Sequence, residues 1–129
     1  MPGKILIIDD EIHIRMLLEQ TLEDLEEESG VAILSASNGE EGLEIIRREK
    51  PDLVFLDIMM PKLNGYEVCR RVKEDPGLDG SLDIVLLTAK GQEVDRRQGL
   101  ELGAKKYMTK PFDPDEVLAT ARSLLGLAG

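Results

Sequence analysis

The feature that most constrains this chain is an apolar run that ends in a carboxylate, within residues 51–61 (PDLVFLDIMMP). Residues 53–56 are all apolar and Pro51 stands before them, a pattern typical of a strand buried on both faces of a parallel sheet. Asp57 ends this strand. Because ligands of open α/β sheets bind beyond the carboxyl ends of the strands, Asp57 lies where chemistry is expected. The simpler alternative is that Asp57 only caps the following turn, a common role of Asp.

Length and composition predict one cytoplasmic domain that does not bind membranes. The 129 residues are enough for one core, and a hydrophobic content of 42% argues against disorder. No run approaches the roughly 20 apolar residues of a membrane span, and the N-terminus lacks the features of a signal peptide. The only cysteine, Cys69, cannot form an internal disulfide, which fits a reducing cytosol. Its helical spacing with Val72 indicates a small buried side chain rather than a reactive thiol.

The charge argues against direct binding to nucleic acid. The formal net charge is −10, whereas nucleic-acid binding needs Lys and Arg to replace counterions at the phosphates. Part of the acidic excess is a run at residues 26–28, which we interpret as a solvated helix end.

Strand and helix patterns alternate five times along the chain. Ser37 and Asn38 each have a Glu three residues later, as does Asn64, which is the pattern of a capping box at a helix start. Asp113 followed by Pro114 predicts the start of the last helix. The expected strands are 4–9, 31–36, a third opened by Pro51 and ending at Asp57, 82–88 and 104–108. The expected helices are 11–28, 37–49, 64–74, 92–102 and 113–125.

This alternation predicts an α/β fold, a (βα)5 doubly wound parallel five-stranded sheet of the flavodoxin-like type. The first, third and fourth strands are apolar throughout and should be central, whereas the second and fifth are weaker and should be edges. The strand order 2-1-3-4-5 satisfies both conditions. In that order the first and third strands are neighbours whose crossovers leave in opposite directions, so a crevice opens between them.

Five polar residues should meet at the rim of this crevice, at the ends of four strands: Asp9, Asp10, Asp57, Thr88 and Lys110. Neighbouring carboxylates repel one another and raise each other's pKa, and a hard divalent cation such as Mg²⁺ relieves that conflict. A metal, an ammonium group and a hydroxyl around an acceptor carboxylate would stabilise a phosphoryl group.

With these residues in this order, the chain resembles the response-regulator receiver domain of two-component signalling. The matching pieces are IDDE at 8–11, LDIMMPKLNGYE at 56–67, LLTAK at 86–90 and GLELGAKKYMTKPF at 99–112. The resemblance covers nearly the whole chain.

The resemblance implies a role for each rim residue. Asp57 would accept a phosphoryl group from a phosphohistidine on a sensor histidine kinase or a histidine phosphotransfer protein, and Thr88 and Lys110 would contact that group. The implied cofactor is Mg²⁺, with ligands Asp10, Asp57 and the backbone carbonyl of Met59, and with Asp9 acting through a bound water. Such a domain catalyses only its own phosphorylation and dephosphorylation, so we do not expect an enzyme with a separate substrate.

The resemblance also implies how the signal leaves the domain. Phosphorylation would draw the Thr88 hydroxyl inward, and Tyr107 would turn from solvent into the vacated space. The surface formed by the fourth helix, fifth strand and fifth helix would then change, and an unknown downstream protein would bind there. Lys110-Pro111 resembles the cis peptide of the family.

The chain is most similar to receivers of transcription regulators with a winged-helix effector, but it departs from their dimerisation pattern. Lys105 and Lys106 replace an acidic pair, and Thr120 replaces an Arg, so we expect a monomer. Lys105, Lys106, Arg96 and Arg97 should instead form a basic patch for an acidic or amphipathic partner. Because the sequence ends shortly after the fifth helix, we expect residues 1–129 to be a single receiver domain without an output domain.

Three other classes of protein remain as alternatives. A haloacid-dehalogenase-type phosphatase needs a second Asp two residues after the nucleophile, where this chain has Met59. A flavodoxin-like electron carrier is disfavoured because the acidic residues 9–11 would repel the FMN phosphate. An adaptor receiver that is not phosphorylated is disfavoured because every expected catalytic position is intact. His13 is interpreted as a surface residue rather than a phosphohistidine.

Overall fold

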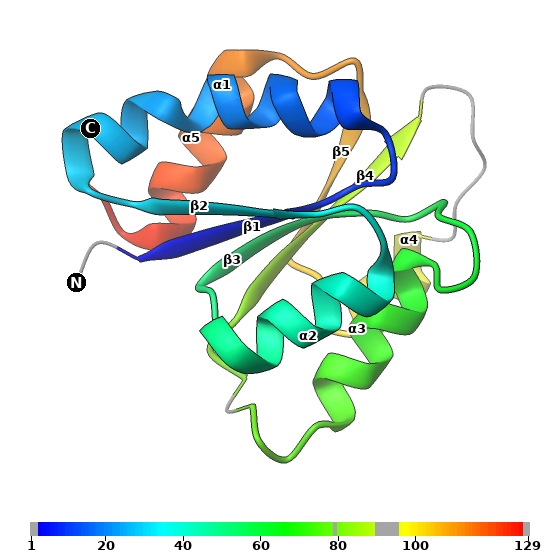
Figure 1. Ribbon diagram of the computed structural model, residues 1–129. Helices are drawn as coiled ribbons and strands as arrows, with labels where there is room; N and C mark the ends of the chain where they lie inside the picture. The colour runs from blue at the N-terminus through cyan, green and yellow to red at the C-terminus, as the bar shows by residue number, and fades with distance from the viewer. Residues whose placement is uncertain (1–2, 79, 90–95, 128–129) are drawn as a thin grey trace.

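Five parallel strands form one sheet with helices on both faces (Figure 1). The structure is a computed structural model that describes residues 3–78, 80–89 and 96–127. The strands are β1 (Lys4–Ile8), β2 (Ala32–Ala36), β3 (Leu53–Asp57), β4 (Asp83–Ala89) and β5 (Lys106–Lys110). Their order is β2-β1-β3-β4-β5. The predicted fold and strand order are confirmed.

The helices divide between the two faces of the sheet. Figure 1 shows α1 (Ile12–Ser29) and α5 (Pro114–Leu125) on one face, with α2 (Gly39–Glu49), α3 (Gly65–Glu74) and α4 (Arg96–Glu101) on the other. Among the described residues, none of the helices combines the length and apolar character of a membrane-spanning segment.

Two cores result from this double covering. Leu6, Ile8 and Leu56 belong to the core on the α2 and α3 side, whereas Ile7 and Phe55 belong to the core under α1 and α5. Successive strand residues point to opposite faces, so strands covered on both sides must be apolar at every position. That requirement explains the uninterrupted apolar runs of β1 and β3.

Side-chain caps fix where α2 and α3 begin. Asn38 Oδ1 accepts a hydrogen bond of 2.8 Å from the Glu41 N–H, and the Glu41 carboxylate accepts one of 2.7 Å from the Ser37 N–H. Asn64 Oδ1 accepts a bond of 3.0 Å from the Glu67 N–H. Of the two capping boxes expected near residue 37, only the Asn38 half of one forms as expected, because Asn38 precedes the first helical turn. The Glu41 carboxylate reaches back to the Ser37 N–H instead of the Asn38 N–H.

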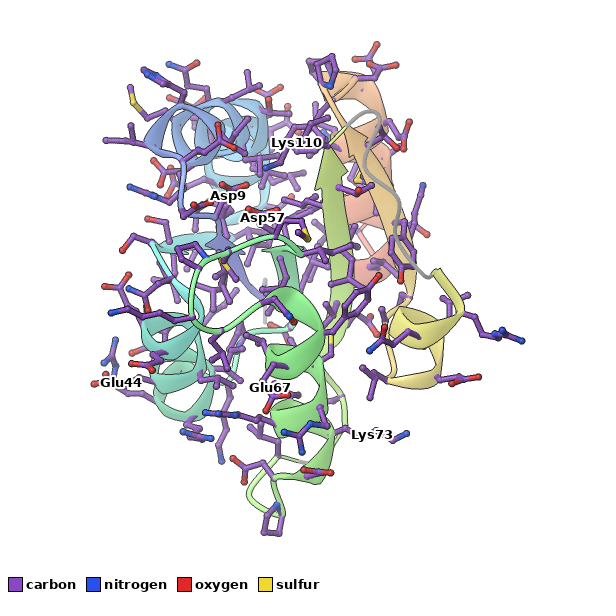
Figure 2. All side chains as sticks on the ribbon, turned by 90° about the vertical axis from the view of Figure 1, so that its right-hand side faces the viewer. Asp9, Glu44, Asp57, Glu67, Lys73 and Lys110 are labelled. Atoms are coloured by element: carbon purple, nitrogen blue, oxygen red, sulfur yellow. The ribbon has the colours of Figure 1, made fainter. Side chains whose placement is uncertain are left out.

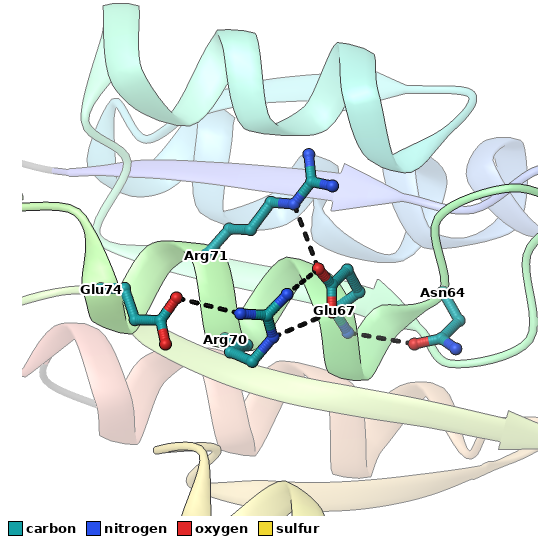
Figure 3. A network of polar contacts seen from close by, with 5 residues as sticks. All are labelled: Asn64, Glu67, Arg70, Arg71 and Glu74. Atoms are coloured by element: carbon teal, nitrogen blue, oxygen red, sulfur yellow. Dashed lines mark hydrogen bonds and ion pairs between the residues drawn. The ribbon is translucent and has the colours of Figure 1, made fainter.

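The exposed side of α3 carries a chain of ion pairs (Figure 3). The Glu67 carboxylate meets both Arg70 and Arg71, and Arg70 also reaches Glu74 at 3.1 Å. Exposed pairs of this kind contribute little to stability. Glu67 also donates its backbone N–H to Asn64. The ion pairs therefore begin at the residue that the cap fixes, next to the loop that follows β3.

Both predicted ends of the fifth strand are wrong, and the fourth strand is displaced by one residue. The strand expected at 104–108 is β5 at Lys106–Lys110, because the Ala104 N–H still bonds to the Gly99 carbonyl at 3.0 Å and completes the end of α4. Lys110 therefore ends β5 rather than following it, and Thr88 is followed by one more strand residue, Ala89. Of the helix expected at 92–102, residues 92–95 lie outside the described residues and 96–101 are helical.

Gly65 allows α3 to begin directly against the end of β3. Its N–H donates a hydrogen bond of 2.8 Å to the Ile58 carbonyl. A Cβ at this position would lie 2.6 Å from the Asp57 carbonyl oxygen and 2.8 Å from the Ile58 Cα. Both are backbone atoms, which cannot turn away as a flexible side chain can.

We therefore expect Gly65→Ala to lower the free energy of unfolding by about 2 kcal/mol, as overpacking against a rigid neighbour does. Urea unfolding followed by circular dichroism measures this change. Gly77→Ala is the matched control, because its Cβ would meet only the Asp75 side chain, at 3.2 Å. Equal losses in the two variants would contradict the role given to Gly65.

Candidate functional site

The ends of four strands converge on one rim of the sheet. Asp9 follows β1, Asp57 ends β3, Thr88 lies near the end of β4 and Lys110 ends β5. Figure 2 shows Asp9 and Asp57 close together at this rim, with Lys110 beside them. The parallel arrangement of the strands is the reason, because it brings every carboxyl end to the same edge.

Three carboxylates form the centre of the site. Asp9, Asp10 and Asp57 each offer an oxygen, and these oxygens all lie within 4.8 Å of one another. The Asp9 and Asp57 residues are only 0% and 3% exposed, whereas Asp10 is open to solvent. The cluster is therefore a buried pair of acids with a third acid at its mouth.

Lys110 is the cation that faces this cluster. Its Nζ lies 2.8 Å from Asp9 Oδ2, 3.6 Å from Asp57 Oδ1 and 3.6 Å from Glu11 Oε1. Burial works to lower the pKa of Lys110, but the hydrogen bond to Asp9 and the charge of Asp57 outweigh burial and raise it. Lys110 therefore stays charged.

One ammonium group does not compensate the buried acids. Burial, and then the nearby charge of Asp9, raise the pKa of Asp57 to about 7 against the lowering effect of Lys110. Burial also raises the pKa of Asp9, although Lys110 and the Glu11 N–H oppose it. Closely spaced carboxylate oxygens with excess negative charge match the ligand preference of a hard divalent cation. The donor set thus fits Mg²⁺, with Asp9, Asp10 and Asp57 as the residues that could hold it.

Backbone contacts fix the orientation of the acids. Asp9 Oδ1 accepts a hydrogen bond of 2.9 Å from the Glu11 N–H, and Arg15 Nη1 donates one of 2.7 Å to the Asp9 carbonyl. Asp57 Oδ1 accepts a bond of 3.3 Å from the Met59 N–H. The use of the Met59 carbonyl as a metal ligand stays a prediction, as does the water through which Asp9 would act.

Sequence reasoning missed Glu11 and Arg15. A signal for Arg15 was present, because the helix macrodipole disfavours a cation in the first turns of a helix, so Arg there needs a local acceptor. The carbonyl of Asp9 is that acceptor. Glu11 offered no comparable signal, since an acidic residue before a helix is common.

The expected switch residues lie in the interior. Thr88 is 3% exposed and Tyr107 is 9% exposed. The expectation that Tyr107 faces solvent is wrong for this structure. Its ring packs into the core on the α2 and α3 side, next to Gly99. The Lys110-Pro111 peptide bond is cis.

The expected basic patch is partly neutralised. Lys105 lies 3.9 Å from Asp83, and Lys106 lies 3.8 Å from Glu116. Lys106 also donates a hydrogen bond of 3.2 Å to the Thr120 hydroxyl. Arg97 is exposed, and the side chain of Arg96 lies outside the described residues.

The remaining two residues fit their simpler interpretations. His13 is exposed on α1. Cys69 is 1% exposed, and burial raises the pKa of its thiol to about 12, which keeps the thiol protonated and unreactive at neutral pH.

Comparison with known proteins identifies the family. The family model described as response regulator receiver domain matches residues 5–122. The chain belongs to the response regulator receiver domain family. The recognition made from the sequence motifs is confirmed, and with it a place in two-component signalling. Receivers of this family are phosphorylated by sensor kinases and act as signalling proteins rather than as conventional enzymes.

Similar curated proteins are transcriptional regulators by name. The alkaline phosphatase synthesis transcriptional regulatory protein PhoP of Bacillus subtilis is 47% identical over 125 residues, covering 97% of this chain and 49% of that protein. The probable transcriptional regulator ycf27 of Porphyra purpurea is 48% identical over 122 residues, covering 95% of this chain and 47% of that protein. The chain thus spans about half the length of these relatives.

Solved structures of similar length share the fold. The chemotaxis protein CheY4 of Vibrio cholerae superposes with a TM-score of 0.81 at 28% identity, covering 95% of this receiver and 98% of that chain. A CheY-like response regulator receiver domain protein from Methanospirillum hungatei gives a TM-score of 0.79 at 31% identity, covering 98% and 96%.

The raised pKa of Asp57 makes stability depend on pH. Folding raises this pKa from the ordinary 3.8 to about 7, so between these values the folded receiver keeps a proton that the unfolded chain has released. Wild-type stability in EDTA therefore falls as the pH rises through this window, and the loss is complete above the folded pKa.

We expect Asp57→Asn to be more stable than wild type at pH 8 in EDTA by about 1 kcal/mol or more, and the advantage to shrink toward pH 5. Urea unfolding at both pH values measures the difference. Asp52→Asn is the control for loss of one negative charge, because Asp52 is exposed at the opposite end of β3. An advantage of Asp57→Asn that is the same at both pH values would show that burial of the carboxylate is not its cause.

Proposed function

We propose that this receiver is activated by transfer of a phosphoryl group from a phosphohistidine to Asp57, with Mg²⁺ as cofactor. The observation that carries the proposal is the position of Asp57, which ends a central strand inside the carboxylate cluster and 3.6 Å from Lys110. The phosphohistidine would belong to a sensor histidine kinase or a histidine phosphotransfer protein.

The chemistry follows from the residues around Asp57. An ionised Asp57 oxygen forms a bond to phosphorus while the phosphorus–nitrogen bond breaks, and the imidazole takes the electron pair. Asp9, Asp10 and Asp57, with the Met59 carbonyl, would hold Mg²⁺, and the metal would supply positive charge that favours the ionised acid. Lys110 is near enough to move from Asp9 to the phosphoryl oxygens, and Thr88 would donate a hydrogen bond from its hydroxyl. The domain catalyses only its own phosphorylation and dephosphorylation.

The proposed output is a change in the face formed by α4, β5 and α5, transmitted through Thr88 and Tyr107 to a downstream protein. The names of the longer relatives make transcriptional regulation the proposed setting. The expectation of no nucleic-acid partner disagrees with relatives that are transcriptional regulators by name. The charge of −10 concerns only these 129 residues, which span about half the length of those relatives. We propose that they act as one receiver domain, in the cytoplasm and away from the membrane.

Phosphorylation is tested by intact mass with acetyl phosphate and Mg²⁺, measured promptly at neutral pH because acyl phosphates hydrolyse. We expect an adduct of about 80 Da on wild type and none on Asp57→Asn. The matched control is Asp52→Asn, which removes a carboxylate from the other end of β3 and should keep the adduct. EDTA should abolish the adduct on every variant. An adduct that persists in Asp57→Asn would contradict the assignment of Asp57 as the acceptor.

We expect the receiver to stay monomeric when activated, because Lys105, Lys106 and Thr120 depart from the dimerisation pattern that the resemblance implies. Within the domain, Lys106 lies 3.8 Å from Glu116 and donates a hydrogen bond to the Thr120 hydroxyl. Light scattering with and without a beryllofluoride phosphate mimic measures the mass. Lys106→Asp combined with Thr120→Arg moves the surface toward the family's dimerisation pattern and serves as the comparison. A wild-type dimer on activation would overturn the prediction, and amide-exchange changes confined to α1 would overturn the proposed face.

A further inference from the structure

The ring of Tyr107 occupies a pocket built by three other elements. Leu86 of β4, Gly99 of α4 and Tyr66 of α3 surround it. The Tyr107 hydroxyl lies 3.4 Å from the Tyr66 hydroxyl. An added Cβ on Gly99 would collide with the Tyr107 hydroxyl oxygen and would lie 2.6 Å from Leu86 Cδ1 and 2.9 Å from the Tyr107 Cζ.

We propose that Gly99 and Tyr66 are positioning residues for the Tyr107 switch: Gly99 admits the ring to the interior, and the Tyr66 hydroxyl holds it there. This inference rests on the proposed switch role of Tyr107 and assigns the control of its position to α3 and α4. It goes beyond the response of Tyr107 to Thr88, because it concerns the pocket that receives the ring.

Gly99 carries most of the effect. Glycine weakens a helix interior relative to alanine, so its presence within α4 needs a compensating reason. The Tyr107 ring supplies that reason, since no other residue type leaves the pocket open. A close-packed interior cannot absorb an extra atom at these distances without moving a neighbour.

Tyr66 makes a smaller contribution. A hydroxyl–hydroxyl separation of 3.4 Å is longer than the usual 2.7–2.8 Å of such bonds, so the contact is weak. Burial, followed by the Tyr66 hydroxyl, raises the pKa of Tyr107, and its phenol therefore stays protonated and able to donate.

A hydrogen bond also joins α3 and α4, the two helices that flank the Tyr107 ring. Lys73 extends from α3 toward α4 (Figure 2) and donates a hydrogen bond of 2.9 Å to the Glu101 carbonyl. α3 and α4 thus meet at the Tyr107 ring and again near their C-terminal ends, through Lys73 and Glu101. Displacement of the ring would be transmitted to α3 as well as to α4.

The composition of the chain allows a direct test. There are two tyrosines and no tryptophan, so in a Tyr66→Phe background the tyrosine fluorescence reports Tyr107 alone. We expect Gly99→Ala in this background to increase acrylamide quenching by about two-fold or more, because the ring moves from the interior to solvent. Gln98→Ala is the matched control, since it raises the helix propensity of α4 at an exposed position and should leave quenching unchanged. Unchanged quenching in Gly99→Ala, or an equal change in the control, would overturn the role of Gly99.

The role of Tyr66 is tested by a double-mutant cycle of Tyr66→Phe and Tyr107→Phe in urea unfolding. The two midpoint shifts should be non-additive if the hydroxyls interact, and additive shifts would remove Tyr66 from the proposal. The Asp57 adduct is measured by mass on the same variants, which leave the rim residues intact. Absence of the adduct from wild type would refute the proposed function. Its presence together with unchanged quenching would refute only this inference.

Discussion

The rest of the structure depends on the interaction of two buried carboxylates with one ammonium group. Asp9 and Asp57 lie out of solvent, and among the described residues Lys110 is the cation that lies within 3.6 Å of both. Burial of charge without full compensation costs free energy, as the raised pKa values of both acids show. The site is therefore not at its electrostatic optimum by itself, and a divalent cation or a transferred group with its metal would lower its free energy.

The rest of the fold makes this concentration of charge tolerable. β1 and β3 pack against apolar side chains on both faces, and this packing offsets the free energy that the buried acids at their ends cost. Gly65 brings the start of α3 against the backbone of Asp57, and Arg15 holds the backbone of Asp9. The two strands, the turn at Gly65 and the Arg15 side chain thus position the two carboxylates.

The sequence predicted the strand order and the helix starts because those depend on local signals. Continuous apolar runs identified the central strands, and Asn38, Asn64 and Asp113 accept the cap hydrogen bonds that their positions suggested. The predicted start of β5 was wrong, because Ala104 still belongs to the turn that ends α4. Its N–H donates a hydrogen bond to the Gly99 carbonyl. The inward Tyr107 and the pairing of Lys106 with Thr120 could not be predicted either, because both depend on contacts between elements distant in sequence.

Lys106 of β5 donates a hydrogen bond to the Thr120 hydroxyl of α5, 14 residues later in the chain. The contact joins the edge strand of the sheet to the last helix within one molecule. A shift of β5 along the sheet would therefore act on α5 directly, and a shift of α5 would act on β5. The two elements form one surface whose parts respond together.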